Sequence, residues 1–213
     1  VGSEMCIRDR FTRPEFKVER ASYDVPTPSA ARGIVESLYY HPGIRWHIRR
    51  IYVLNPIEFT TIRRNEVKSK ILGGTAMRIA QGKEDEPYLV TTKQIVQRAS
   101  MVLTNVHYVI EAEFEMLPEK AAPGDNPGKF QDIVTRRMRK GQCFSTPYFG
   151  CREFPAHFKQ WEGGPIPTID ETRDLGFMLY DFDYSDPQNI TPLYFRAKME
   201  HGVIQVAGCE VFR

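Results

Sequence analysis

Residues 25–54 read VPTPSAARGIVESLYYHPGIRWHIRRIYVL, and this stretch decides the fold. It predicts a helix whose first turn is capped by Thr27, with Pro28 at the first helical position. The apolar residues of this helix recur every three or four positions, and they are Ala31, Ile34, Val35 and Leu38. A Pro-Gly pair at positions 42–43 ends the helix. One apolar face is therefore turned toward a core.

A β-strand follows this helix. Trp46 and Ile48 alternate with polar residues, and Ile51 and Val53 then take the apolar role on the opposite parity. Such a change of parity within one strand indicates a bulge, here near Arg50. The end of the helix thus lies beside a strand that carries arginines on its polar face, a combination suited to nucleic acid. The residues at that helix end are Tyr39, Tyr40 and His41.

Composition and charge narrow the class of protein. The chain has 213 residues, 41% of them hydrophobic, which is enough for a buried core. It has no apolar run of about 18 residues, so no membrane-spanning helix is predicted. The net charge of +2 does not by itself indicate a polyanionic partner.

The basic residues are nevertheless clustered, and each cluster is either a solvated face or a binding surface for a polyanion. The first cluster contains Arg45, Arg49, Arg50, Arg63, Arg64, Lys68 and Lys70. The second contains Lys129, Arg136, Arg137, Arg139 and Lys140.

Cysteine and histidine spacing gives no sign of a metal site. Cys6, Cys143, Cys151 and Cys209 form no Cys-x-x-Cys motif, and the five histidines lack the spacing of metal ligands. We therefore predict no metal and reduced thiols in a cytoplasmic protein.

A second helix is predicted to start after Asn126, with Pro127 in its first turn and Gly141 as its stop. Its apolar stripe consists of Phe130, Ile133, Val134 and Met138. The basic residues at its C-terminal end complement the helix dipole, whereas Lys129 lies at the positive end, which is unfavourable. Some other interaction is needed to keep a cation there.

The remaining segments complete the predicted order. Residues 106–116 alternate most clearly as a half-buried strand, and 57–61 form a shorter strand that ends before Arg63 and Arg64. We interpret 71–98 as a functional or mobile insertion without periodicity. Further strands are predicted at 149–154, 176–183, 193–199 and 203–206.

The order strand, helix, strand, strand, helix, strand predicts an α+β fold, a ferredoxin-like (RRM-like) two-layer sandwich with a C-terminal antiparallel β extension. We assign the ferredoxin-like RNA-processing domain to 11–155 and the β extension to 156–213. Residues 1–10 resemble translated sequencing adaptor, which predicts that this segment is not native and that the N-terminal strand is truncated.

Several segments match a known family in unbroken order. They are Phe11–Arg20, Thr27–Ser37, Ile62–Val67, Val106–Ala112, Asn126–Phe130, Pro147–Phe154 and Asp174–Asp181. Together they resemble the type I-C (Dvulg subtype) Cas-five protein of CRISPR systems, a member of the repeat-associated RNA-processing (RAMP) superfamily.

This resemblance implies an activity and partners. Proteins of this kind cut the CRISPR repeat transcript near the base of its hairpin without metal or cofactor, giving a 2′,3′-cyclic phosphate. They can remain bound to the 5′ handle of the product within a surveillance complex. The implied partners are repeat RNA and crRNA, the other type I-C complex subunits and target DNA, with no membrane.

The resemblance also implies site residues. The family has a tyrosine at the end of the first helix, matched by Tyr39, and an adjacent lysine and histidine at the start of the second. Lys129 matches the lysine, but Phe130 stands at the histidine position, so turnover is predicted to be slow or absent. His41 is either a substitute or a helix cap. The residues assigned to RNA binding are Arg45, Arg49, Arg50, Arg63, Arg64, Tyr40, Arg136 and Arg137.

The departure at Phe130 leaves two functions open. The first is a metal-independent endoribonuclease, and the second is a non-catalytic subunit that caps the 5′ handle of crRNA while another protein cuts.

Overall fold

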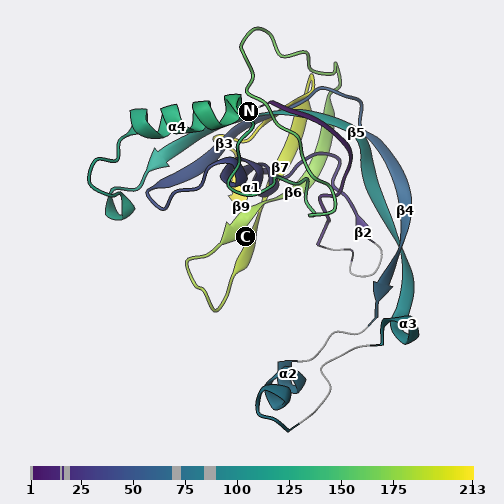
Figure 1. The fold of residues 1–213 in the computed structure, drawn as a ribbon. Helices are drawn as coiled ribbons and strands as arrows, with labels where there is room; N and C mark the ends of the chain where they lie inside the picture. The colour runs from purple at the N-terminus through teal and green to yellow at the C-terminus, as the bar shows by residue number, and fades with distance from the viewer. Residues whose placement is uncertain (1, 15, 17–19, 69–72, 84–89) are drawn as a thin grey trace.

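The computed structural model describes residues 2–14, 16, 20–68, 73–83 and 90–213 (Figure 1). Its helices are α1 (Pro28–Leu38), α2 (Gly73–Ala80), α3 (Thr91–Gln94), the short 3₁₀ helix η1 (Pro118–Lys120) and α4 (Pro127–Arg139). Its strands are β1 (Gly2–Asp9), β2 (Arg20–Ala21), β3 (Ile44–Val53), β4 (Glu58–Val67), β5 (Ile95–Met116), β6 (Arg173–Asp183), β7 (Thr191–Glu200), β8 (Val203–Gln205) and β9 (Val211–Phe212).

The strands form one curled, nine-stranded sheet with the central order β1-β5-β3-β8-β7-β6. The long strand β5 organises it, because β4 pairs with its first part and β3 and β1 flank its second part. These pairs are antiparallel, whereas the short β2 runs parallel to β5. The mixed sheet of this α+β fold curls around α1, which contacts β3, β5 and β6 (Figure 1).

Helix α1 forms as the sequence predicts. The Thr27 hydroxyl accepts a hydrogen bond from the Ala30 N–H at 3.2 Å, and Pro28 begins the helix. The predicted apolar stripe is confirmed, since Ala31, Ile34, Val35 and Leu38 are all at most 2% exposed. Burial of each larger side chain stabilises the fold by roughly 1.5–3 kcal/mol.

The predicted bulge and second helix are also confirmed. The register of β3 against β5 shifts between Ile48 and Arg50, which moves the apolar residues to the opposite parity. Asn126 caps α4 by accepting the Lys129 N–H at 2.9 Å. Phe130 and Val134 are buried on its inner face.

The long β4–β5 arm corrects two predictions. β4 continues through Arg63 and Arg64 to Val67, and β5 starts at Ile95 rather than at residue 106. No residue of β4 is buried, and neither is any of residues 95–99 at the start of β5, so this part of the arm lacks the pattern of a half-buried strand. The stretch 71–98 also contains α2 and α3, of which no residue is buried, whereas positions 71–72 and 84–89 lie outside the described residues.

The strand predicted at 149–154 is wrong. This segment is a compact turn, in which the Phe149 N–H donates to the Phe154 carbonyl at 2.9 Å. Gly150 has a φ of +70°, and a Cβ there would lie only 2.1 Å from the Arg10 carbonyl oxygen. Because an L side chain fits neither that backbone conformation nor that close approach, the glycine fixes a turn that the aromatic pattern concealed.

The ends of the chain join the same sheet. Gly2–Asp9 pairs with β5 as β1, in the position of a first strand, while the adaptor origin of 1–10 stays a prediction. The C-terminal strands extend the sheet because β8 pairs with both β3 and β7. Within the described residues, no strand between α4 and β6 completes the second half of the predicted ferredoxin-like order.

Candidate active site

Tyr39 ends α1 and is held in place by its backbone. It has an extended conformation, with φ −149° and ψ 117°, and its N–H donates to the Val35 carbonyl at 3.2 Å. The Trp46 indole of β3 donates to the Tyr39 carbonyl at 3.0 Å. The residue is only 7% exposed, so α1 and β3 together fix the direction of its phenol ring.

Lys129 lies in the first turn of α4 and has an acidic partner. Its Nζ donates to Asp125 Oδ1 at 2.8 Å, and the Asp125 side chain is only 2% exposed. Asp125 Oδ2 accepts the Ala122 N–H, also at 2.8 Å, which fixes the carboxylate in the loop before α4. This ion pair supplies the interaction that a cation at the positive end of a helix dipole requires.

The structure brings Tyr39, His41 and Lys129 together around the Phe130 ring. Phe130 is fully buried, and its ring centroid lies 6.1 Å from that of Tyr39 and 4.8 Å from that of His41. Lys129 Nζ lies 6.0 Å from the same centroid. The ends of two helices that are distant in sequence therefore meet at one aromatic ring.

Both ring nitrogens of His41 face protein groups. Nδ1 accepts the Gly43 N–H at 3.0 Å, and Nε2 lies 3.8 Å from Asp125 Oδ2. Because the first contact uses the lone pair of Nδ1, the proton of a neutral imidazole is on Nε2 and points toward the carboxylate. His41 thus helps to order the loop around Asp125.

Arg137 lies over the Tyr39 ring. Its guanidinium carbon lies 5.0 Å from the centroid of the Tyr39 ring, and its Nη1 donates to the Leu38 carbonyl at 3.2 Å. The interaction ties the last part of α4 to the end of α1. Arg137 therefore adds a second positive charge next to Tyr39.

The protonation states of these groups follow from their surroundings. Burial raises the pKa of Tyr39, and the carboxylate of Asp125 acts in the same direction, against the opposing effect of Arg137 and Lys129. The hydrogen bond and charge of Asp125 raise the pKa of Lys129. The hydrogen bonds from Lys129 and the Ala122 amide lower the pKa of Asp125. At neutral pH, the site holds a neutral phenol beside a lysine–aspartate ion pair.

The arginines predicted on β3 are mostly paired across the sheet. Arg49 Nη1 donates to Glu113 Oε1 at 3.0 Å. Arg50 interacts with Glu111 at 3.4 Å and donates to Gln205 Oε1 at 2.9 Å. Arg45 is exposed on the same strand. The polar face of β3 thus carries mainly arginines that are paired with carboxylates, and few unpaired cations.

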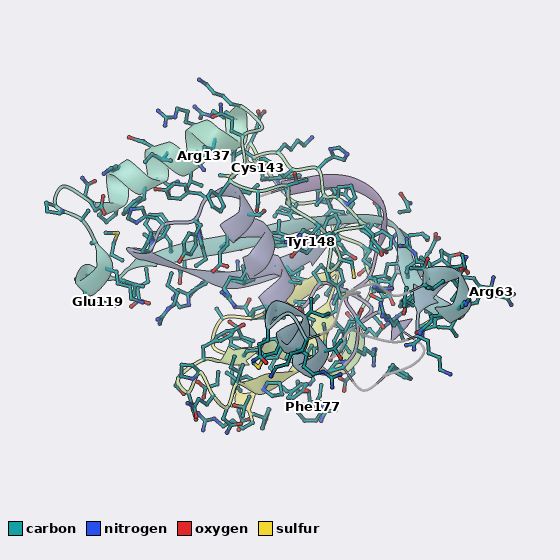
Figure 2. All side chains as sticks on the ribbon, turned by 60° about the horizontal axis from the view of Figure 1, so that its bottom comes forward. Arg63, Glu119, Arg137, Cys143, Tyr148 and Phe177 are labelled. Atoms are coloured by element: carbon teal, nitrogen blue, oxygen red, sulfur yellow. The ribbon has the colours of Figure 1, made fainter. Side chains whose placement is uncertain are left out.

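The other predicted RNA-binding residues are spread over the molecule. Arg64 pairs with Glu153, and Arg63 is exposed without an ion-pair partner among the described residues. Both lie on the β4–β5 arm, and Figure 2 shows Arg63 far from Arg137. Arg136 is exposed on α4. Tyr40, next to Tyr39, is 56% exposed and is therefore not a core residue.

Sequence reasoning did not select Asp125. It precedes Lys129 by four residues, a spacing that indicates an ion pair, but it stands before the helix rather than inside it. Among the described residues, no group of three or more His, Cys, Asp and Glu side chains is arranged to hold a metal ion. No helix in the described part of the chain is long and apolar enough to cross a membrane.

Comparison with known proteins identifies the family. A family model described as "CRISPR-associated protein (Cas_Cas5)" matches residues 9–207. The chain belongs to the Cas5d family of CRISPR-associated proteins. This membership confirms the resemblance that the sequence segments indicate.

Two curated Cas5d relatives cover most of the chain. The "CRISPR pre-crRNA endoribonuclease Cas5d" of Mannheimia succiniciproducens is 45% identical over 203 residues, covering 92% of this chain and 89% of the relative. The protein of the same name from Thermus thermophilus is 36% identical over 213 residues, covering 92% of this chain and 86% of the relative.

Solved structures share the fold. The structure titled "Crystal Structure of CRISPR-associated Protein" aligns with a TM-score of 0.67 at 23% identity, covering 98% of this chain and 93% of the other. A functionally uncharacterized Streptococcus mutans protein aligns with a TM-score of 0.66 at 22% identity, with the same coverage. The Cas5d chain thus has the architecture of a CRISPR-associated protein.

Proposed function

We propose that this chain is a pre-crRNA endoribonuclease that cuts CRISPR repeat transcripts beside Tyr39 and Lys129. Its membership of the Cas5d family and the two curated relatives named as pre-crRNA endoribonucleases support the activity. The observation that carries the location is the convergence of Tyr39 and Lys129 on the Phe130 ring.

The proposed reaction is attack by a ribose 2′-hydroxyl on the neighbouring phosphate. The 2′-oxygen forms a bond to phosphorus, the bond to the 5′-oxygen breaks, and the products are a 2′,3′-cyclic phosphate and a 5′-hydroxyl. Negative charge builds up on the phosphorane oxygens. Lys129 Nζ would stabilise this charge when it exchanges Asp125 for the phosphate, assisted by the positive end of α4.

Tyr39 acts as a hydrogen-bond donor in this scheme. A phenol with a raised pKa keeps its proton at neutral pH and is a poor general base. It can donate that proton to a phosphate oxygen or to the departing 5′-oxygen. Arg137, stacked on the ring, adds positive charge to the same place.

The described residues of the site offer no evident general base to remove the proton of the 2′-hydroxyl. Phe130 cannot accept a proton, and both nitrogens of His41 contact protein groups. We assign His41 a positioning role, in which it orders the loop that holds Asp125. Hydroxide from solvent then serves as the base, so turnover is slow, which a subunit that keeps its product can tolerate.

Product retention fits the remaining expectations. We infer that residues 11–155 hold the 5′ handle of crRNA in the cytoplasm, and that the chain is a subunit of a type I-C surveillance complex that reaches target DNA. The exposed cations Arg45, Arg63 and Arg136 are the best placed of the predicted residues for backbone contacts, because they are not held by carboxylates of the described residues.

A second function is favoured by Phe130 itself. A fully buried phenylalanine at the position of the family histidine removes a titratable group from the site. The chain would then bind and cap the 5′ handle while another protein cuts. The same RNA contacts serve both functions, so only a cleavage assay separates them.

The deciding experiment incubates repeat RNA with excess protein in EDTA. A specific cut with a cyclic-phosphate end supports the endoribonuclease, whereas intact RNA in a tight complex supports the capping subunit. We expect Lys129→Ala and Tyr39→Phe to lose cutting and to retain binding. Lys140→Ala and Tyr184→Phe are matched controls at exposed positions and should cut at the parental rate. Parental cutting by Lys129→Ala would remove this lysine from the mechanism.

A further inference from the structure

A cavity of about 540 Å³ lies on the other side of the Tyr39–Tyr40 segment from Lys129. Because Tyr39 has an extended backbone, consecutive side chains point to opposite sides, and Tyr40 lines the cavity while Tyr39 contacts Phe130. Residues of α1 form its floor, and Phe144, Ser145 and Tyr148 form a wall. Tyr148 of this wall lies beside α1 (Figure 2). The cavity is thus one residue away from the proposed phosphate site.

Exposed aromatic rings surround this cavity. Tyr40 is 56% exposed, Phe144 69% and Tyr148 40%. None of the three stacks on another aromatic ring among the described residues, and each leaves a large part of its surface exposed. The wall is nevertheless tied to α1, because the N–H groups of Phe144 and Ser145 donate to the Ser37 carbonyl at 2.8 and 3.0 Å. These rings therefore form a prearranged surface for stacking.

The floor contains a glycine that helix packing does not require. Gly33 lies in the middle of α1, where glycine is about 1 kcal/mol less favourable than alanine. A Cβ at this position would meet no atom within 4 Å, because it would point into open space. The glycine keeps the floor flat and lets a planar group approach the helix backbone closely.

The charge at the cavity selects what kind of group enters. Glu36 lines it, and its carboxylate is held by Arg32 Nη1 at 2.8 Å. A carboxylate repels phosphate but accepts hydrogen bonds from an exocyclic amino group, as glutamate does with cytosine N4. Stacking surfaces with one acceptor suit a nucleobase, and the phosphates then remain outside near Lys129 and Arg137.

We propose that this cavity binds one unpaired nucleobase of the RNA substrate, next to the cleaved phosphate, and prefers a base with an exocyclic amino group. This nucleobase site rests on the proposed function, because that function makes repeat RNA the ligand. It does not depend on catalysis, because binding of the base is needed by a cutting enzyme and by a capping subunit alike.

The test measures affinity for a series of repeat RNAs that each carry one abasic nucleotide in the unpaired segments beside the hairpin. For the parental chain, we expect one position at which loss of the base weakens binding about 5- to 150-fold, the range for one stacked base. At that position, uridine should bind more weakly than cytidine, and Glu36→Gln should remove the difference.

Gly33→Leu fills the cavity with a strong helix former, and Tyr148→Ala removes a wall from an exposed position. In both variants, intact RNA should bind more weakly, and the abasic penalty at that one position should disappear. Gly74→Leu is the matched control, because its Cβ also meets nothing within 4 Å and it lies in the exposed helix α2. It should behave like the parental chain.

Two results would overturn the proposal. One is an RNA series in which no abasic position matters, and the other is a penalty that persists unchanged in Gly33→Leu. If the chain cleaves the RNA but no abasic position weakens binding, the nucleobase site is ruled out and the endoribonuclease activity stands. A base-dependent affinity without cleavage supports the nucleobase site and removes the endoribonuclease.

Discussion

Asp125 Oδ1 accepts a hydrogen bond from Lys129 Nζ at 2.8 Å, and this pair accounts for a lysine at the wrong end of a helix dipole. The same carboxylate is 3.8 Å from His41 Nε2. In the absence of RNA, Asp125 therefore occupies Lys129, the cation that we propose binds the RNA phosphate. Phosphate binding requires that Lys129 exchange one negative partner for another.

Asp125→Asn should tighten RNA binding. Asparagine keeps an oxygen for the Ala122 N–H, so the loop before α4 retains its shape, but the charge that competes with phosphate is gone. We expect the dissociation constant for repeat RNA to fall about 2- to 5-fold at 0.1 M salt, because the phosphate no longer competes with a carboxylate for Lys129. Filter binding or fluorescence anisotropy measures it. Weaker binding would show that Asp125 aligns Lys129 for the phosphate instead of competing with it.

The cleavage rate should rise with pH and show no plateau near neutrality. Lys129, with a raised pKa, stays cationic until the pH passes that raised value, and Tyr39 likewise keeps its proton. Asp125, with a lowered pKa, stays anionic until the pH falls below its ordinary range. With hydroxide as base, the logarithm of the single-turnover rate constant should increase by about one per pH unit between about pH 6 and 9. A plateau in that range would show that a group of the protein, and not hydroxide, removes the 2′-hydroxyl proton.

The parts of the fold that the sequence predicts are those whose pattern is local. Thr27 and Asn126 are caps with a defined chemistry, and the parity change around Arg50 records a bulge because both halves of β3 face a core. β4 and the start of β5 have no such pattern, since β4 and residues 95–99 contain no buried residue. The turn at Gly150 depends on contact with Arg10, a residue 140 positions earlier, which no local pattern reveals.

The candidate site shows the same division. Tyr39 and Lys129 came from matching positions in a family, and their meeting depends on a tertiary contact through Phe130. The pairing of Arg49 with Glu113 could not be read from the chain, because it requires the register of β3 on β5. The cavity beside Tyr40 was missed for the same reason, because it combines segments whose proximity the fold creates. Asp125 is a local partner of Lys129, four residues earlier, but it stands before the helix and so outside the helical pattern.

Phe130→Ala should destabilise the fold. The side chain is fully buried, and its ring contacts those of Tyr39, His41 and Phe114, so its removal leaves a cavity between α4 and the sheet. We expect the free energy of unfolding to fall by about 3–5 kcal/mol in a urea titration. Phe144→Ala is the control, because Phe144 is 69% exposed, and it should change stability by at most about 0.5 kcal/mol. Equal losses in the two variants would contradict the core position of Phe130.

Arg63 and Arg49 should differ in their contribution to RNA binding, although both are exposed arginines on strands. Arg49 is already neutralised by Glu113 at 3.0 Å, whereas Arg63 has no ion-pair partner among the described residues. A free cation that contacts phosphate releases a counterion, so Arg63→Ala should lower the slope of log affinity against log salt by about one. Arg49→Ala should lower the slope by less than about half as much, because an arginine that stays paired with Glu113 neutralises no RNA phosphate and so releases no counterion from the RNA. Titrations of repeat RNA between about 50 and 200 mM salt measure both slopes. If Arg49→Ala changes the slope as much as Arg63→Ala does, the ion pair opens on binding, and the polar face of β3 is part of the RNA path.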